Sequence, residues 1–344
     1  GLWELNPDGT RKLDNSNQPI PTYGNGQITE LARVFTGLWF GGQPWGSGGW
    51  SDDDSTVPMQ MWAEKHDYGA KILLGGYTIP ARAPTVENGL HDVDDALRSL
   101  FEHTNCAPFI SKQLIQFLVT SNPSSNYVAR ISAVFANDGT GKRGNLAAVV
   151  KAILLDSEAR DPRWYAGAPE FGRLKEPVQR AMAIARAGNL SRYTNLLWWT
   201  WGEFNSAAFQ EPTYSPTVFN FFRPGYQPPG LLTQNGLVGP AFQIVDSYSS
   251  ISFPNKLWEV TTEGLFEWGN YQFAPDYVEL VAQAGSTAQL VDEANLIFCG
   301  GTMSAATRDN ILAAINQVPS YDTTLRAQLV VYLAATCPEG AVQR

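Results

Sequence analysis

Residues 92–156 decide the fold class and read DVDDALRSLFEHTNCAPFISKQLIQFLVTSNPSSNYVARISAVFANDGTGKRGNLAAVVKAILLD. Its apolar residues recur every three to four positions, which is the period of an amphipathic helix. One apolar stripe covers residues 93–101 and a second covers 109–117. Asn122-Pro123 begins the third stripe and Asn145 the fourth, with Pro near the first turn, where a helix tolerates it. The stretch therefore predicts four consecutive helices.

On the N-terminal side of this stretch the sequence predicts small hairpins and loops. Residues 2–5 and 10–13 flank the turn Asn6-Pro7-Asp8-Gly9, in which Pro fixes φ and Gly accepts a positive φ. Part of this turn also has the spacing of a calcium loop, although the terminal Glu ligand is missing. We further predict a helix over 27–38 and a second hairpin that pairs 59–62 with 71–74 through the turn at 66–69.

On the C-terminal side helical periodicity returns. Glu176-Pro177 opens a fifth helix, and Pro254 interrupts a probable helical stretch over 241–264. Further helices are predicted near 276–284, 287–298, 305–317 and 323–336. Ser304 is the expected N-cap of the third of these, and Gly300-Gly301 the expected stop of the second.

We therefore predict a mainly α fold, a multi-helical globular domain with small β-hairpins near the N-terminus and long ordered loops. A single mostly helical domain is expected over residues 1–344. Its parts are a hairpin- and loop-rich region (1–90), a helical region (91–190), an aromatic and Pro-rich segment (191–240) and the C-terminal helices (241–344).

The segment WWTWGEFNSAAFQEPTYSPTVFNFFRPGYQPPG, residues 198–230, is dense in aromatic rings and in its second half in prolines. The prolines exclude a regular helix or a central strand, because each removes a backbone donor. The rings argue against disorder. The segment is thus expected to be either an ordered surface lined by rings or a loop plugged into the core.

Composition narrows the class of protein. The chain has a net charge of −9, a sequence pI near 4.9 and no basic block, which argues against nucleic acid as a partner. No run approaches the apolar length of a membrane span. With three His and three Cys and no CxxC pair, a metal centre is not expected, and no cofactor is predicted. Cys299 and Cys337 are either bridged or, with Cys106, buried thiols.

Several segments resemble the bacterial family known as domain of unknown function 1800. They are ELARVFTG at 30–37, HDYGAKILLG at 66–75, HTNCAPFISKQLIQFLVTSNPSS and its continuation at 103–156, SPTVFNFFRPGYQPPG at 215–230, and the terminal CPEGAVQR. Together they span nearly the whole chain.

The resemblance implies a mostly helical, bacterial and commonly exported protein, so a periplasmic or secreted location is expected. Members are often encoded beside a sulfatase-like exported protein, which makes such a protein a candidate partner. No reaction is firmly attached to the family. The chain is expected to match the C-terminal two-thirds of a typical member, since the long helical region that precedes GLWELNPDGT in the family is absent here. A second departure is Thr104-Asn105-Cys106, where the family favours Pro after the His.

Motifs for a nucleophile elbow, a phosphate-binding loop, a dinucleotide site or a zinc protease are missing from the sequence. Paired carboxylates beside rings are the best remaining catalytic option, because glycosidases use two carboxyl groups and pyranose faces stack on aromatic rings. Glu203 is the expected acid, and Glu211 the base or nucleophile. The substrate-binding rings are expected to be Trp198, Trp199, Trp201 and Tyr214. Alternatively, the rings are core and both Glu are solvated.

His66 and Asp67 form a second candidate catalytic pair, since a His beside a carboxylate can act in acid–base chemistry. The alternative is that both residues cap a hairpin turn.

The function that the sequence favours is a carbohydrate-active protein, specifically a glycoside hydrolase that acts on a polysaccharide or oligosaccharide. The alternative is a non-catalytic glycan- or protein-binding or assembly protein of the cell envelope. A metal-dependent oxidoreductase is the weakest class, because ligand-rich spacing is missing.

Overall fold

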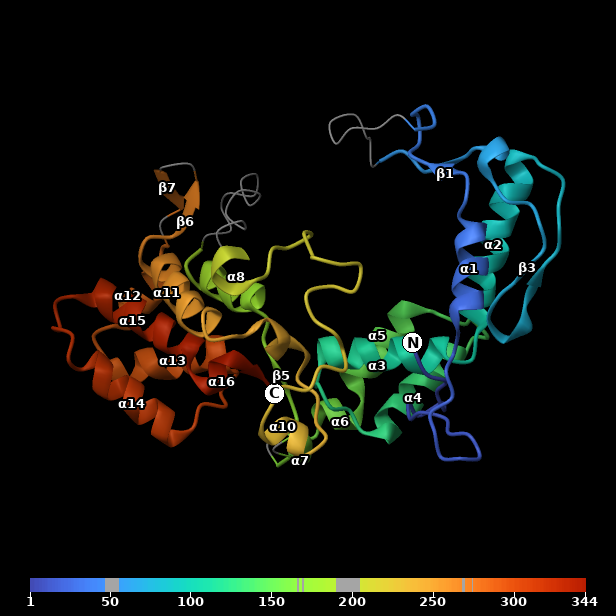
Figure 1. Cartoon of the computed structure of the whole chain (residues 1–344). Coiled ribbons are helices and arrows are strands. Elements are labelled where there is room, and N and C mark those ends of the chain that lie inside the picture. The colour runs from blue at the N-terminus through green and yellow to red at the C-terminus, as the bar shows by residue number, and fades with distance from the viewer. Residues whose placement is uncertain (47–55, 166, 169, 190–204, 268–269, 274) are drawn as a thin grey trace. The chain divides into compact units, whose positions relative to one another are not determined.

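The computed structural model describes residues 1–46, 56–165, 167–168, 170–189, 205–267, 270–273 and 275–344 (Figure 1). The chain divides into two compact units. Unit 1 consists of Gly1–Leu114 and Ser124–Ile153, and unit 2 of Ile115–Pro123 and Leu154–Arg344. The single domain expected from the sequence stays a prediction.

The predicted fold class is confirmed. The described chain is mainly α-helical, and its named strands pair as two-stranded antiparallel sheets. In unit 1 the helices are α1 (Asn25–Val34), α2 (Val86–Glu102), α4 (Ser125–Ala136), most of α3 (Cys106–Leu118) and most of α5 (Leu146–Leu155), with the 3₁₀ turns η1 (Ala63–Lys65) and η2 (Leu74–Gly76). Its strands are β1 (Leu38–Trp39), β2 (Gln60–Met61), β3 (Lys71–Ile72) and β4 (Thr78–Ile79).

The four helices predicted over residues 92–156 are confirmed as α2 to α5. Thr85 caps α2 by accepting the Asn88 N–H, and Ser124 caps α4 in the same way from Tyr127. The buried Tyr127 then donates its hydroxyl to the carbonyl of Ile153 at 2.6 Å, which fixes α4 against α5. Capping thus sets where α2 and α4 begin, and the Tyr127–Ile153 hydrogen bond holds α4 against α5.

The first predicted hairpin is confirmed, whereas the strand pairing predicted for the second is wrong. Gly9 has a φ of 76° in the turn between the bridged residues Leu5 and Arg11, as the predicted turn requires. Segments 59–62 and 71–74 do not pair with each other: β2 pairs with β1, and β3 pairs with β4. The turn η2 reverses the chain directly after β3, so β4 is the nearer partner.

Unit 2 contains most of the C-terminal helices. They are α6 (Ser157–Arg160), α7 (Pro162–Tyr165), α8 (Pro177–Ala187), α10 (Leu231–Gln234), α11 (Ser249–Thr262), α12 (Val278–Gln283), α13 (Thr287–Cys299), α14 (Ala305–Ile315), α15 (Thr323–Thr336) and α16 (Pro338–Ala341), with the 3₁₀ turn η4 (Pro240–Ile244). Strand β5 (Arg173–Leu174) pairs with β8 (Val342–Gln343), and β6 (Leu265–Glu267) with β7 (Asn270–Phe273).

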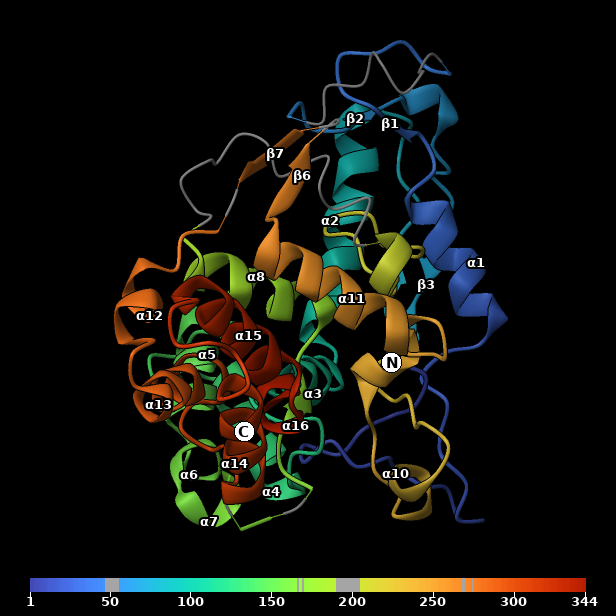
Figure 2. The ribbon, with the colours of Figure 1, turned by 90° about the vertical axis from the view of Figure 1, so that its left-hand side faces the viewer.

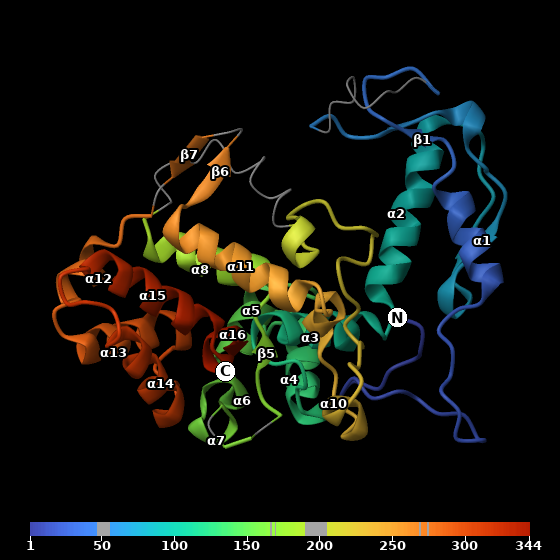
Figure 3. The same ribbon diagram turned by 60° about the vertical axis from the view of Figure 1, so that its left-hand side comes forward.

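Helix α15 lies at the centre of unit 2. It contacts α8 and α11 on one side and α13 and α14 on the other (Figures 2 and 3). Its Val330 is fully buried, as are Ile184 of α8, Leu257 of α11 and Leu290 of α13. Full burial of each such side chain stabilises the fold by about 1.5–3 kcal/mol relative to exposure.

The predicted ends of the C-terminal helices are confirmed. Ser304 caps α14 by accepting the Thr307 N–H. After α13, Gly300 and Gly301 have φ values of 61° and 79°, which is the left-handed conformation that commonly stops a helix. Pro254 lies inside α11 and does not end it.

The Pro-rich part of the aromatic segment is partly a core plug. Phe222 is buried against Ala241 and Ile244 and stacks on Phe117, with ring centroids 6.2 Å apart. Phe219 does not belong to the plug, because its side chain is 73% exposed. Asn220 lies between these two rings with a φ of 72°, so the chain turns there and separates them.

Candidate functional site

Most of the carboxylate and aromatic site predicted from the sequence lies outside the described residues. Trp198, Trp199, Trp201 and Glu203 fall within 190–204, and their roles stay predictions. The two described members are neighbours in one turn. The carbonyl of Glu211 accepts the N–H of Tyr214 at 3.0 Å, and the Tyr214 side chain is 65% exposed.

His66 and Asp67 are adjacent in sequence, but their side chains bond to different partners. The carboxylate of Asp67 accepts from the Arg33 guanidinium at 2.7 and 3.0 Å and from the Gly69 N–H at 2.9 Å. These donors, with Arg33 first, lower the pKa of Asp67 well below its usual range. The His66 side chain instead pairs with Asp92 of α2. From the sequence, Asp92 was expected to lie in a helix, and no functional role was predicted for it.

The carboxylate of Asp92 is the centre of a buried polar cluster in unit 1. It accepts from Lys71 Nζ at 2.5 Å, Arg82 Nη1 at 2.5 Å and His66 Nε2 at 3.2 Å. The side chains of His66, Lys71 and Asp92 are fully buried. Burial acts to raise the pKa of Asp92, but the hydrogen bonds from Lys71 and His66 and the charges of Lys71 and Arg82 outweigh it, so the pKa is lowered.

The polar atoms of the cluster hydrogen-bond to one another and to nearby backbone carbonyls. His66 Nδ1 lies 2.7 Å from the Thr36 carbonyl, while Nε2 faces Asp92. Both ring nitrogens therefore face oxygen acceptors. The ammonium group of Lys71 donates to Asp92 and also to the carbonyls of Asp67 and Gly69. These contacts favour a structural role for His66, and its catalytic role stays a prediction.

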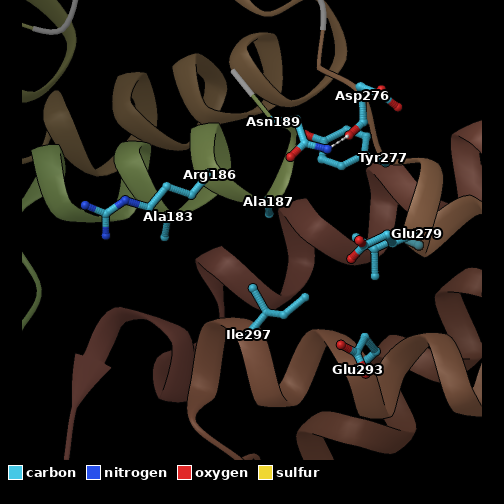
Figure 4. A pocket seen from close by; sticks show the side chains of 10 residues that line it. Ala183, Arg186, Ala187, Asn189, Asp276, Tyr277, Glu279, Glu293 and Ile297 are labelled. Atoms are coloured by element: carbon cyan, nitrogen blue, oxygen red, sulfur yellow. Dashed lines mark hydrogen bonds between the residues drawn. The ribbon is translucent and has the colours of Figure 1, made fainter. Parts of the chain in front are cut away.

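Unit 2 contains a pocket that the sequence analysis did not predict. Its volume is about 360 Å³, and it lies between α8, α12 and α13 (Figure 4). It is lined by Ala183, Arg186, Ala187, Asn189, Asp276, Tyr277, Glu279, Leu280, Glu293 and Ile297. Ligand pockets in proteins are typically about 300–1,000 Å³, so this one suits a small ligand.

Helix α8 leaves room for the pocket because it presents small side chains there. Ala183 and Ala187 lie one turn apart on the same face as Arg186, whereas Ile184 points into the core and is fully buried. The rim is set where α8 ends. The Gly188 carbonyl accepts the Asp276 N–H at 2.8 Å. A Cβ on Gly188 would lie 2.7 Å from Pro275, so this close approach depends on glycine.

Two carboxylates enter the pocket from different helices. Glu279 belongs to α12 and Glu293 to α13, and Figure 4 shows both on the opposite side from Arg186. Within the described part of the chain, neither carboxylate has a side-chain hydrogen bond or ion pair. Unpaired carboxylates in a concave site are available to a ligand.

Two other polar groups of the pocket are hydrogen-bonded within the protein. The Tyr277 hydroxyl donates to the Thr261 carbonyl at 3.2 Å, and burial raises the pKa of Tyr277, so the phenol stays protonated. Asn189 donates to the Asp276 carbonyl at 3.4 Å. With three carboxylates and one guanidinium in its lining, the pocket is acidic.

No cluster of three metal-ligating side chains occurs among the residues that the structure describes. Among the same residues, no helix has the length and apolar character needed to cross a membrane.

The fold and the pocket define a mainly helical protein with an acidic pocket in unit 2. The chain belongs to the family described as protein of unknown function (DUF1800), whose sequence model matches residues 13–341. This match confirms the resemblance found in the sequence and covers nearly the whole chain. No curated protein matches the chain. No solved structure matches it either.

Proposed function

We propose that the protein is a glycoside hydrolase whose substrate binds in the pocket between α8, α12 and α13. The observation that carries this proposal is that Glu279 and Glu293 enter one pocket from different helices with unpaired carboxylates. Glycoside hydrolysis needs such a pair, since one carboxylic acid protonates the leaving oxygen while the other carboxylate attacks the sugar or activates water.

The remainder of the pocket lining supports a sugar as the ligand. Ala183, Ala187 and Ile297 offer apolar surface, and Arg186 and Asn189 offer hydrogen-bond donors. A pyranose ring presents the matching combination of apolar faces and hydroxyl groups. In the sequence, Asn189 directly precedes the segment 190–204, which contains Trp198, Trp199 and Trp201. These rings lie outside the described residues, and their substrate-binding role stays a prediction.

The test is release of reducing sugar from a panel of polysaccharides and chromogenic glycosides. We expect Glu279→Gln and Glu293→Gln each to lower the turnover rate by about 10²-fold or more, the usual size of a general acid–base contribution. Glu263→Gln is the matched control, because Glu263 is an exposed carboxylate outside the pocket lining. Turnover that survives both pocket substitutions would refute this pair.

The same assay separates the two candidate carboxylate pairs. If Glu203→Gln and Glu211→Gln abolish turnover while the pocket variants keep it, the pair predicted from the sequence is the catalytic one. Loss of turnover in the pocket variants alone assigns the reaction to Glu279 and Glu293.

A second candidate function is non-catalytic binding of a glycan or of a sulfatase-like exported protein. It is favoured by exposed aromatic surface in unit 2, where Phe209 contacts Tyr248 with ring centroids 6.0 Å apart. These side chains are 40% and 58% exposed, and exposed ring clusters often mark interaction sites. Binding that Phe209→Ala and Tyr248→Ala weaken, without turnover on any glycan, would support this function.

We propose a location in the periplasm or outside the cell, which the family resemblance implies. Fractionation of a bacterium that expresses the native gene tests this location, and recovery in the cytoplasm would contradict it.

A further inference from the structure

Two cysteine side chains meet in unit 2 at the ends of two helices. Cys299 is the last residue of α13, and Cys337 links α15 to α16. Their Sγ atoms lie 3.7 Å apart. A disulfide has an S–S length of about 2.05 Å, so the two sulfurs need to approach by roughly 1.7 Å.

The surroundings make the two thiols unequal. Cys337 Sγ accepts the Gly340 N–H at 3.3 Å and is half-buried, whereas the Cys299 side chain is buried. The hydrogen bond with Cys299 is the main cause that lowers the pKa of Cys337 to about 7. The same hydrogen bond, together with burial, raises the pKa of Cys299. Cys337 is therefore the more nucleophilic thiol near neutral pH.

A half-buried lysine lies beside the pair. Lys175 Nζ donates to the carbonyl of Phe298, which adjoins Cys299, at 2.8 Å and to the carbonyl of Gly340, three residues after Cys337, at 3.0 Å. Its positive charge favours the thiolate form of both cysteines. The geometry thus combines two adjacent sulfurs, an accessible nucleophile and a cation that stabilises it.

We propose that Cys299 and Cys337 are a redox site that forms a reversible disulfide by exchange with a small disulfide of the glutathione class. The Cys337 thiolate attacks one sulfur of the small disulfide, whose S–S bond breaks and releases one small thiolate. Cys299 then gives up its proton and attacks Cys337 Sγ, which releases the second small thiol. Two protein thiols are oxidised by two electrons in total, and one small disulfide is reduced to two thiols.

The disulfide would restrain the C-terminal segment of unit 2. Directly after Cys337, the Ala341 carbonyl accepts the Lys175 N–H at 2.8 Å, and Gln343 of β8 pairs with Arg173 of β5. A covalent link from α13 to Cys337 would hold the residue from which this segment starts. Amide exchange in residues 339–343 is therefore expected to be slower in the oxidised protein than in the reduced one.

The test equilibrates the full-length folded protein in reduced or oxidised glutathione, followed by denaturing alkylation and mass measurement. Three alkyl labels are expected on the reduced protein, which has three free cysteines. One label, on Cys106, is expected on the oxidised protein, together with a peptide pair that joins Cys299 to Cys337. Three labels after oxidation, or glutathione adducts without this cross-link, would overturn the proposal.

Single variants test the order of attack. Cys299→Ser should accumulate a glutathione adduct on Cys337 at least about tenfold faster than Cys337→Ser accumulates one on Cys299. Cys106→Ser is the matched control and should form the disulfide as the unchanged protein does. Circular dichroism checks that each variant is folded. Equal rates at the two cysteines would contradict the assigned nucleophile.

Discussion

At the residue scale, Asp92 is the carboxylate on which the buried polar contacts of unit 1 converge. Its loss would leave the ammonium of Lys71 buried without an anion, and removal of one partner of a buried ion pair costs about 3–5 kcal/mol. We expect Asp92→Asn to lower the free energy of unfolding by about that amount at pH 7 in a urea titration. Asp94→Asn, an exposed change in the same helix, should alter it by less than about 0.5 kcal/mol.

The pH dependence of this effect follows from the lowered pKa of Asp92. A carboxyl group whose pKa is lower in the folded state than its ordinary value of 3.8 stabilises the fold fully above that value. This stabilisation is lost as the pH falls through the folded-state pKa. The difference between Asp92→Asn and the unchanged protein should therefore be constant from pH 7 to about 5 and shrink toward pH 2. A difference that persists undiminished at pH 2 would show that the charge is not its cause.

At the element scale, the end of α8 fixes the rim of the pocket. In Gly188→Ala the new Cβ would lie 2.7 Å from Pro275 and 3.3 Å from the Tyr277 ring, so the segment that carries Asp276 must move. Overpacking of this kind costs about 1–3 kcal/mol. We expect a lower melting temperature and weaker glycan binding by calorimetry. Gly285→Ala is the control, since its Cβ would meet nothing within 4 Å. Unchanged binding in Gly188→Ala would contradict the assigned rim.

The elements also show which features were predictable from the sequence. Helices α2 to α5 and α13 to α15 were predictable because the apolar period and local signals such as Ser304 and Gly300 act within a few residues. The pairing of residues 59–62 with 71–74 was wrong, because strand pairing depends on which partner the intervening turns bring close.

The candidate site was less predictable than the helices. Glu279 and Glu293 have no motif around them, and only the packing of α12 on α13 places them in one pocket. The burial of Asp92 was likewise missed, since it follows from contacts with Lys71 and Arg82, which are distant in the sequence. Proximity made by tertiary packing is not encoded in any local pattern.

At the scale of the whole molecule, each compact unit has a core of its own. Val34, Leu73, Ile79 and Ala96 form a core cluster in unit 1, whereas the larger core of unit 2 is built around α15. Cores that do not share residues can open separately, as cooperative units with their own free energies. Asp92→Asn lies in unit 1 and Gly188→Ala lies in unit 2. Together the two substitutions test whether the units unfold independently.

We predict that native-state hydrogen exchange in low urea resolves two cooperative openings. Asp92→Asn should lower the opening free energy of amides in α2 and leave α15 unchanged, because its lost contacts lie in unit 1. Gly188→Ala should do the reverse, because Pro275 and Tyr277 lie in unit 2. If either substitution lowers the opening free energy of amides in both α2 and α15 by the same amount, the 344 residues unfold as the single domain expected from the sequence.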